Sequence, residues 1–462
     1  MPINSFLYPG AKFTPPYSVA NSCRFNAGSS DYLSKTYSSD GNQKTWTFSA
    51  WLKRSYLGTT GTLIFSFQDP SGDARSDISF AADKLYVSWN PTGSSWYYAD
   101  TSPSRFFRDV SGWYHLVVAC DTTQSTDTNR LKIYINGEQL GSDTIDTYPS
   151  QDQDTGFNKT GYVHEIGRYA HASSNTWDGY MCEVVMIDGQ QLAPTSFGEF
   201  DEDSPTIWKP KSVSGLTFGT NGFHLDFKDS SALGNDVSGN NHDFAANNLT
   251  SIDQSTDTCT NNFCTLNPLD GGNSGTFTEG NLKLVTANSG YATTRGTFGV
   301  STGKWYFEGK LISGNAEIGI ITSDQDINDS DDPLGKSTNG YAYTNSGNKY
   351  NNDTNASYGD TYTDDDIIGV ALNLDDGELF FYKNGTIQNS GTAAYTSLSS
   401  NTYHPAVSDD SGSTACTWEL NFGNAPFSIS SGNSDANGHG DFEYSVPSGY
   451  FALCTKNLAE SG

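Results

Sequence analysis

The sequence predicts an all-β protein of two or three domains. The chain has 462 residues, too many for one ordinary β-sandwich. Large apolar and small polar residues alternate from Asn21 onwards, for example over residues 45–53 and 131–135, which is the period of a half-buried strand. Helical periodicity is absent, apart from one short turn expected over residues 193–200. Strands therefore dominate the expected fold.

The composition supports this fold class. Hydrophobic residues make up only 35% of the chain, but 26 Tyr, 26 Phe and 9 Trp supply the bulk that real cores need. Much of the remainder is Ser, Thr, Asn, Asp and Gly, which build turns and are poor helix formers. The pairs Asn136-Gly137 and Asn384-Gly385 each predict a tight hairpin, because both positions of a type I′ turn need positive φ.

The chain is strongly acidic, with 53 acidic and 25 basic residues and a formal net charge of −28. A polyanion would be repelled, because affinity for nucleic acid rests on lysine and arginine neutralising phosphates. Nucleic acid is therefore excluded as an expected partner. The acidity is interpreted mainly as a means of keeping an aromatic surface soluble, with calcium binding by some Asp clusters as the alternative.

Residues 1–19 lack the basic start and apolar run of a signal peptide. They are either a disordered end or an extended arm, and the aromatic residues among their prolines favour an arm that docks on another subunit. No apolar stretch approaches the ~20 residues of a membrane helix, so no membrane insertion is expected. The cysteines, odd in number and without zinc spacing, are expected to be buried thiols of a protein folded in a reducing cytoplasm. They are Cys23, Cys120, Cys182, Cys259, Cys264, Cys416 and Cys454.

Residues 20–205 carry a series of four short motifs. They are residues 49–51 (SAW), 113–118 (WYHLVV), 132–137 (KIYING) and 166–168 (IGR) followed by 177–185 (WDGYMCEVV). Each motif alone is weak, but in this order they resemble the laminin-G/concanavalin A-like lectin family. The resemblance implies a β-sandwich over residues 20–205.

Residues 260–462 are predicted to form a second domain with its own series of motifs. They are residues 304–309 (KWYFEG), 316–321 (AEIGII), 359–374 (GDTYTDDDIIGVALNL), 377–385 (GELFFYKNG), 403–407 (YHPAV) and 419–427 (ELNFGNAPF). Gly369 lies in an apolar run and is expected to let a ring or another backbone approach closely. In this order the motifs resemble the SPRY (B30.2) family up to residue 458. The two resemblances together imply two β-sandwich (jelly-roll-like) domains in tandem.

Residues 206–259 differ from both domains and are rich in Asn, Asp and Ser. Residues 223–227 (FHLDF) are predicted to be a strand, and residues 236–243 a loop. The stretch is either a connector or a set of strands added to the first sandwich. The sequence leaves these two interpretations open.

No enzymatic activity is expected. A retaining glycosidase needs two carboxylates about 5–5.5 Å apart on one strand face. The acidic run at residues 199–202 is one residue short of the glucanase pattern, and alternation places Glu183 and Asp188 on opposite faces of their strand. No nucleophile elbow accompanies the seven histidines. A carbohydrate-active enzyme, or an accessory module of one, is the alternative.

Calcium is the one cofactor that the sequence suggests, as Ca²⁺ held by hard oxygen ligands. Asp324 and Asp326 begin an acidic run, but the spacing is not that of an EF-hand loop. Asp69 and Asp73, with Asp77 nearby, lie in the region where laminin-G relatives place a calcium ligand. The competing interpretation for both loops is a solvated acidic surface.

Aromatic residues next to amides and hydroxyls predict a sugar-binding surface. Aromatic faces stack on the C–H patches of sugars, and amides and carboxylates bind the hydroxyls. The alternative is that many of these rings belong to the core. The candidate ligand-binding residues are Trp89, Trp96, Tyr97, Tyr98, Tyr341, Tyr343 and Tyr350.

The whole arrangement resembles structural proteins of tailed bacteriophages, on the proline-rich opening, the two domain types and residues 223–243. The resemblance implies a virion surface protein, assembled in the host cytoplasm as a homo-oligomer. It is expected to be a tail-fibre or adhesin component or a capsid decoration. Expected partners are host surface glycans and other virion proteins, the latter through the N-terminal arm. A purely structural virion subunit without a ligand is a further alternative.

Overall fold

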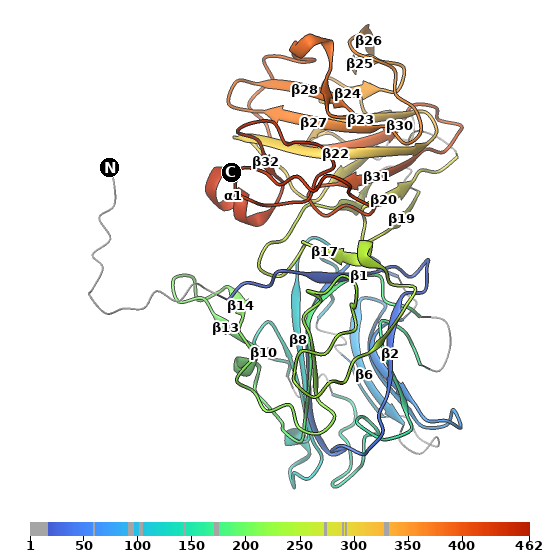
Figure 1. Ribbon diagram of the computed structural model, residues 1–462, viewed down its shortest axis with the longest axis vertical. Helices are drawn as coiled ribbons and strands as arrows, with labels where there is room; N and C mark the ends of the chain where they lie inside the picture. Colours follow the sequence, from blue (N-terminus) through green and yellow to red (C-terminus); the bar gives the residue numbers. More distant parts are fainter. Residues whose placement is uncertain are drawn as a thin grey trace, which may run out of the picture.

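A computed structural model describes residues 17–58, 61–90, 97–100, 105–141, 145–170, 175–271, 275–288, 291, 293–327 and 332–462. Within these residues the chain folds almost entirely into strands, which confirms the predicted all-β class. Two β-sandwiches follow one another along the longest axis, the first blue to green and the second yellow to red (Figure 1). None of the helices in this part of the chain combines the length and apolar character that crossing a bilayer requires.

The first sandwich consists of two antiparallel sheets. One sheet runs in spatial order through β10 (Glu138–Gln139), β9 (Leu131–Ile135), β8 (Tyr114–Asp121), β3 (Thr45–Arg54), β12 (Gly179–Asp188), β1 (Ser22–Phe25) and β17 (Gln254–Ser255), with β15 (Phe223–Leu225) also paired to β12. The other runs through β16 (Ala245–Asn247), β2 (Tyr32–Thr36), β11 (Val163–Ile166), β4 (Thr62–Gln68), β5 (Arg75–Ala81), β6 (Lys84–Asn90) and β7 (Tyr97–Asp100).

Alternation along each strand decides which side chains fill the first core. In β9, Leu131, Ile133 and Ile135 are buried while the residues between them are half-buried, as the period of two requires. Phe48 of β3 stacks on Phe65 of β4 with ring centroids 5.1 Å apart, so the two sheets meet through aromatic faces. The core is therefore closed by residues from both sheets.

The second sandwich repeats this plan. One sheet runs through β18 (Leu266–Gly271), β21 (Thr294–Gly296), β30 (Tyr403–Asp409), β23 (Ala316–Thr322), β24 (Gly340–Thr344), β25 (Asn348–Asn351) and β26 (Thr354–Ser357). The other runs through β19 (Thr276–Thr278), β20 (Lys283–Val285), β31 (Thr417–Asn421), β22 (Lys304–Ser313), β27 (Ile367–Asn373), β28 (Glu378–Lys383) and β29 (Thr386–Ile387), with β32 (Phe451–Ala452) parallel to β22.

Three local predictions are confirmed. Asn136 and Gly137 have φ of 50° and 82°, and Asn384 and Gly385 have 47° and 77°, as type I′ turns require. These turns join β9 to β10 and β28 to β29. A Cβ atom at Gly369 would lie 2.5 Å from the hydroxyl of Tyr306, which is the close approach expected there.

Residues 206–259 are added strands of the first sandwich rather than a free connector. Within them β15 pairs with β12, β16 with β2 and β17 with β1. The predicted boundary at 205/206 falls inside a hairpin of β13 (Gly198–Phe200) and β14 (Trp208–Pro210).

The arm expected at residues 1–19 ends earlier than its predicted boundary at residue 19. Val19 is buried, and its backbone N–H donates to the Thr260 hydroxyl at 3.0 Å. Residues 1–16 lie outside the described residues.

Helical structure is where the sequence was least informative. The turn expected over residues 193–200 is a 3-10 turn at Pro194–Ser196, and further 3-10 turns occupy Asp127–Asn129, Ser251–Asp253 and Asn389–Gly391. The α-helix α1 (Thr455–Ser461) was not predicted. Seven residues make less than two full turns, too few for a 3.6-residue period to stand out.

Candidate functional site: the interdomain junction

Most of the aromatic residues proposed as a sugar surface are in the cores. Trp89 on β6 is 4% exposed in the first core, and Tyr343 on β24 is fully buried in the second. Tyr350 is 7% exposed and its hydroxyl donates to Asp353 at 2.9 Å. Rings covered in this way cannot stack on a ligand, so their assignment as binding residues is wrong and they serve core packing.

Of the remaining aromatic candidates, the structure describes the side chain of Tyr341 alone. Tyr341 on β24 is half-buried and meets Tyr395 edge to face, with ring centroids 5.1 Å apart. Trp96 lies outside the described residues, and of Tyr97 and Tyr98 only the backbone, in β7, is described. The structure therefore places no aromatic platform on the predicted positions that it describes.

The predicted calcium residues are engaged by neighbouring donors. Asp69 accepts hydrogen bonds from the Ser71 hydroxyl and from the backbone N–H of Ala74, and these donors hold the pKa of its carboxyl below the usual range. Asp77 is held by serine hydroxyls instead of joining Asp69 and Asp73. Within the described ranges no three His, Cys, Asp or Glu side chains gather as a metal site.

The second acidic loop is described only in part. The Asp324 carboxylate accepts a hydrogen bond from the Thr322 hydroxyl, and its pKa is lowered chiefly by that bond. Asp326 lies beside it in the same loop, and residues 328–331 lie outside the described residues. The calcium assignment at Asp324 and Asp326 stays a prediction.

Ser49 and His115 resemble a nucleophile and its base, but their hydrogen bonds run in the wrong direction. The two side chains meet at 2.9 Å between Ser49 Oγ and His115 Nε2, and both residues are 1% exposed. Trp208 Nε1 donates to His115 Nδ1 at 2.9 Å. An indole can only donate, so Nδ1 carries no proton and Nε2 must carry it. His115, whose pKa burial lowers to about 3, therefore donates to Ser49 and cannot accept its proton.

Glu183 occupies a strained position on β12. The strand has a bulge between Cys182 and Val185, and Glu183 has a φ of 49°, which non-glycine residues rarely adopt. The bulge breaks the alternation on which the sequence argument about its face depended. Its buried carboxylate accepts a hydrogen bond from the Tyr17 hydroxyl at 3.0 Å and lies 3.0 Å from His224 Nε2. The cluster ties the start of the described chain to the first sandwich.

The other carboxylates considered for hydrolysis also have structural roles. Asp188, at the end of β12, accepts from the backbone N–H groups of Asn42 at 2.6 Å and Asn221 at 2.9 Å. Glu199 on the β13 strand forms an ion pair with Lys209 at 3.8 Å. Each carboxylate thus has its own structural partners rather than a second carboxylate across a cleft.

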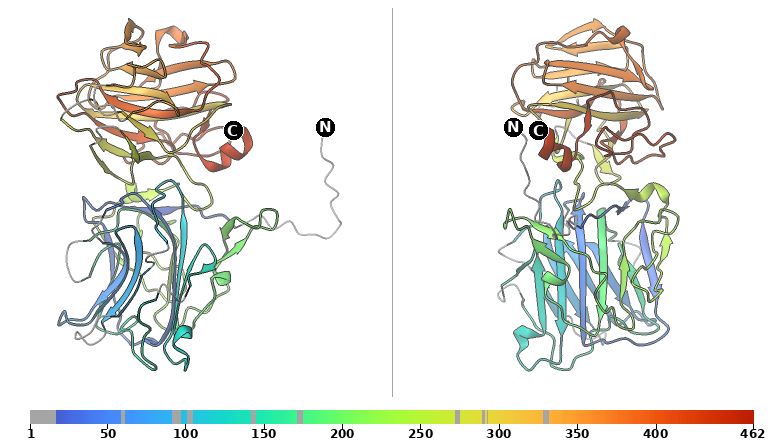
Figure 2. Two further views of the ribbon diagram at one scale, coloured as in Figure 1. Left: turned by 180° about the vertical axis from the view of Figure 1, so that it is seen from behind. Right: turned by 60° about the vertical axis from the view of Figure 1, so that its left-hand side comes forward.

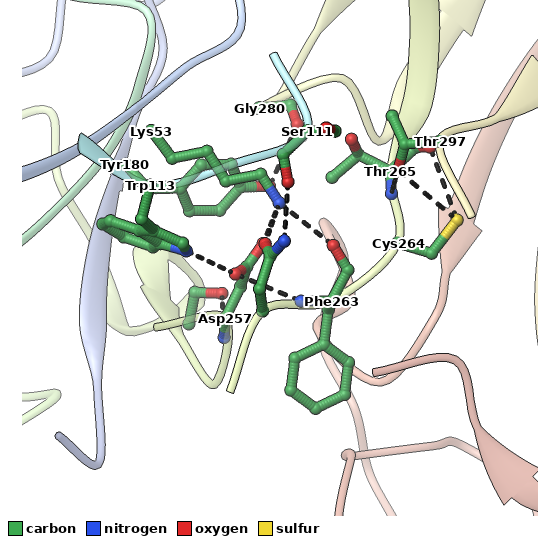
Figure 3. Close-up of polar contacts among 12 residues, drawn as sticks. Lys53, Ser111, Trp113, Tyr180, Asp257, Phe263, Cys264, Thr265, Gly280 and Thr297 are labelled. Carbon is green, nitrogen blue, oxygen red and sulfur yellow. Dashed lines mark hydrogen bonds and ion pairs between the residues drawn. The ribbon is translucent and has the colours of Figure 1, made fainter. Parts of the chain in front are cut away.

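The two sandwiches meet at a buried polar junction centred on Lys53 (Figure 3). Lys53 Nζ donates to Asp257 Oδ2 at 2.7 Å, Asn262 Oδ1 at 2.7 Å and the carbonyl of Phe263 at 3.0 Å. Lys53 is 1% exposed and Asp257 is 0% exposed. Trp113 Nε1 donates to the other oxygen of Asp257 at 3.1 Å. All three hydrogens of the ammonium group and both oxygens of the carboxylate are therefore used.

This junction links the two cores mechanically. Lys53 is the penultimate residue of β3 in the first sandwich, whereas the ring of Phe263 packs in the second sandwich against Tyr306 and Phe442. Burial raises the pKa of the Asp257 carboxyl, and the Lys53 ammonium partly offsets this effect. A buried pair with complete hydrogen bonding fixes one geometry, because each misplaced partner leaves a charge uncompensated.

Arg24 on β1 forms a second tie between the sandwiches. Its guanidinium is 0% exposed and donates to the carbonyls of Ala425 at 3.1 Å and Ile252 at 3.0 Å. Its Nε lies 3.4 Å from a carboxylate oxygen of Glu279 in the second sandwich. Figure 2 shows from both sides that β1 and β17 face the lower end of the second sandwich.

A pocket of about 310 Å³ opens beside Arg24, between the two sandwiches. Its walls are residues 251–256 of the first and residues 423–429 of the second, joined by a 2.7 Å bond from the Thr256 hydroxyl to the Gly423 carbonyl. Hydroxyls, amides and one carboxyl, that of Asp441, line most of it, with Phe427 among the apolar residues. Such a lining can bind a ligand but offers no acid and base pair.

Little in the sequence indicates the junction. Lys53 and Arg54 end an apolar strand, and two adjacent basic residues inside a strand are the one signal that a buried partner was needed. Asp257 lies 204 residues away along the chain, in a stretch interpreted as a possible connector. Asn424 in the pocket follows residues 421–423 (NFG) inside the motif over residues 419–427, which indicates the fold and not a ligand.

Each of the two sandwiches matches a known protein family. Residues 27–192 match the concanavalin A-like lectin/glucanases superfamily, and residues 304–424 match the SPRY domain family. The chain carries a concanavalin A-like domain followed by a SPRY domain. Both resemblances read from the sequence are confirmed, and domains of these kinds are typically non-catalytic binding domains. The resemblance to bacteriophage virion proteins stays a prediction.

The individual relatives each cover about a third of this chain or less. Ran-binding protein 9 of Xenopus tropicalis is 34% identical over 128 residues, which are 27% of this chain and 22% of that protein. The match thus spans less than a quarter of that relative. The SPRY domain of human HERC1 is 17% identical with a TM-score of 0.29, covering 34% of this chain and 96% of that one. Stonustoxin is 21% identical with a TM-score of 0.29, covering 34% of this chain and 27% of its own.

Proposed function

We propose that the protein is a non-enzymatic binding protein of a virion surface, which binds glycans of the host surface or neighbouring virion proteins. The observation that carries the binding function is the junction itself. It fixes the concanavalin A-like and SPRY domains to each other and places a polar pocket between them. A preformed pocket favours binding, because the loops around it need no ordering when the ligand arrives.

The contacts of the residues considered for catalysis support binding over catalysis. The one serine and histidine pair described above has a proton on the wrong nitrogen, and Glu183, Asp188 and Glu199 are each held by structural partners. The virion location is supported by the sequence resemblance of residues 223–243 and of the proline-rich opening. Release by lysis would also explain surface-binding domains that keep seven unpaired cysteines.

The first prediction is retention on host glycans without their cleavage. The full chain, run in native gels containing capsular or cell-wall polysaccharide of the bacterial host, should be retarded, and the polysaccharide should gain no new reducing ends. Glu183→Gln and Glu199→Gln should be retarded equally, because neither carboxylate faces a second one at catalytic distance. New reducing ends that disappear in either variant would instead establish the carbohydrate-active enzyme. Absence of retention on every glycan would favour the purely structural subunit.

The second prediction concerns the N-terminal arm, which we propose as the contact with other virion proteins and with further copies of the chain. Deleting residues 1–16 should leave both domains folded, because Tyr17 and Val19 keep their bonds to Glu183 and Thr260. The truncated chain should lose assembly into the oligomer, measured by light scattering after size-exclusion chromatography. Unchanged thermal unfolding is the control. Normal assembly of the truncated chain would refute the role of the arm.

A further inference from the structure

We propose that the pocket between the two domains binds an uncharged sugar unit and that the side-chain amide of Asn424 holds its hydroxyls. The inference rests on the proposed glycan-binding function and assigns that function a site. It uses the pocket of about 310 Å³, which is at the lower end of the roughly 300–1,000 Å³ usual for small-molecule sites.

Asn424 is the residue that points to a ligand. It is 4% exposed and lines the pocket, yet neither its Oδ1 nor its Nδ2 has a hydrogen-bond partner among the described residues. Buried side-chain amides are nearly always bonded, because an unmade bond costs the full desolvation of the group. One amide offers an acceptor and two N–H donors side by side. Two neighbouring hydroxyls of a sugar ring match that pattern.

The walls of the pocket hold Asn424 in place. Its neighbour Gly423 accepts the hydrogen bond from Thr256, and Ala425 accepts the bond from Arg24. The backbone on both sides of Asn424 is thereby fixed to the concanavalin A-like domain. The amide is consequently presented by a rigid frame, and the site exists only where the two domains meet.

The remaining lining suits a sugar better than other small ligands. Phe427 provides an aromatic surface for C–H groups, and Thr256 and Ser428 provide hydroxyls. An anion is disfavoured by the formal charge of −28 and by the Asp441 carboxyl in the wall. Arg24 is not one of the lining residues, and its guanidinium is directed to the Ala425 and Ile252 carbonyls and to Glu279.

The test uses the full chain with methyl glycosides of glucose, galactose and N-acetylglucosamine as probes. Saturation-transfer NMR should detect at least one of them, and that glycoside should compete with polysaccharide retention. Asn424→Leu keeps the number and branching of the side-chain heavy atoms but cannot bond a hydroxyl, so binding should weaken about tenfold or more. Its thermal stability should be equal or higher, because an unpartnered polar group has been removed. If Asn424 were needed only for the fold, Asn424→Leu would instead lower the thermal stability of the protein.

A second variant tests the pocket independently of whether Asn424→Leu folds, and a third variant is the matched control. Ser428→Trp places a large ring at an exposed rim position and should block binding while the fold is kept. Asn355→Leu, an exposed asparagine on β26 far from the lining residues in sequence, should bind like the wild type.

The outcomes distinguish a failure of the proposed pocket from a failure of the proposed glycan-binding function. Polysaccharide retention that survives both Asn424→Leu and Ser428→Trp would overturn the pocket and leave the glycan-binding function standing. Absence of retention in the wild type would overturn the function as well. Displacement of the glycoside by a neutral peptide, but not by polysaccharide, would assign the pocket to a protein partner and refute the sugar.

Discussion

Replacing Lys53 by methionine is expected to lower the free energy of unfolding by about 3–5 kcal/mol. The substitution leaves the Asp257 carboxylate, which is 0% exposed, without the cation that compensates it. Trp113 donates to the same carboxylate, so its fluorescence should report the loss during urea unfolding. The penalty should shrink as the pH falls, because burial raises the pKa of Asp257 and protonation then removes the uncompensated charge.

The double variant Lys53→Met with Asp257→Leu should recover most of this loss, since an apolar pair can replace a buried ion pair at little cost. The matched control is Lys44→Met, at the residue that precedes the first residue of β3. Lys44 is 38% exposed and 4.0 Å from Asp152, so its removal should cost at most about 1 kcal/mol. Equal losses in the single and double variants would show that Lys53 acts through packing and not through charge compensation.

The second large effect is expected at Glu308 in the SPRY domain. Its carboxylate, 0% exposed on β22, accepts bonds from the backbone N–H groups of Glu443 at 3.0 Å and Tyr444 at 2.9 Å, from Asn421 Nδ2 at 3.1 Å and from the Tyr306 hydroxyl at 3.2 Å. Glu308→Leu would remove the acceptor of all four donors, two of which are part-buried backbone N–H groups, and Asn421 Nδ2 would keep only its bond to the Asp441 carbonyl at 2.9 Å. Each lost bond costs about 1–3 kcal/mol, and the losses are not fully additive. We expect a loss of about 4 kcal/mol or more in urea unfolding.

The pH dependence provides an independent readout at the same residue. Burial raises the pKa of Glu308 to about 7, above the 4.5 of an unperturbed glutamate. The folded state therefore binds a proton that the unfolded chain releases, so this contribution is present below about pH 4.5 and is lost as the pH rises through about 7. The wild type should unfold at a higher temperature at pH 5.5 than at pH 8, and Glu308→Gln should reduce that difference. Glu378→Leu on β28 is the control. It should neither cause the large loss of stability in urea nor reduce the difference between pH 5.5 and pH 8.

Local features of this protein were predictable because they depend on neighbours in sequence. Alternation at residues 131–135 places every second side chain in a core, whichever strand lies opposite. Asn136-Gly137 adopts positive φ because Asn and Gly tolerate this conformation better than most residues, and the same holds for Asn384-Gly385. The order of two sandwich domains followed from ordered motifs of this kind.

The candidate site was not predictable in the same way. Alternation shows that Trp89 and Tyr343 share a face with other apolar residues, but not whether a second sheet covers that face. Both rings were therefore proposed as a binding surface and are core. Asn424 follows a glycine at a strand end, and nothing next to it in the sequence distinguishes a bonded amide from one without a partner.

The sequence by itself determined the strand content, the hairpins and the order of the two domains, since each is decided by interactions over a few residues. Only the tertiary structure decided that residues 223–255 add strands to the first sandwich and that Lys53 meets Asp257. The physical reason is that these contacts join residues far apart in the sequence. A buried charge requires a partner, but the partner can come from any part of the chain that the fold brings within about 4 Å. The pocket beside Asn424 exists for the same reason, because its two walls belong to different domains.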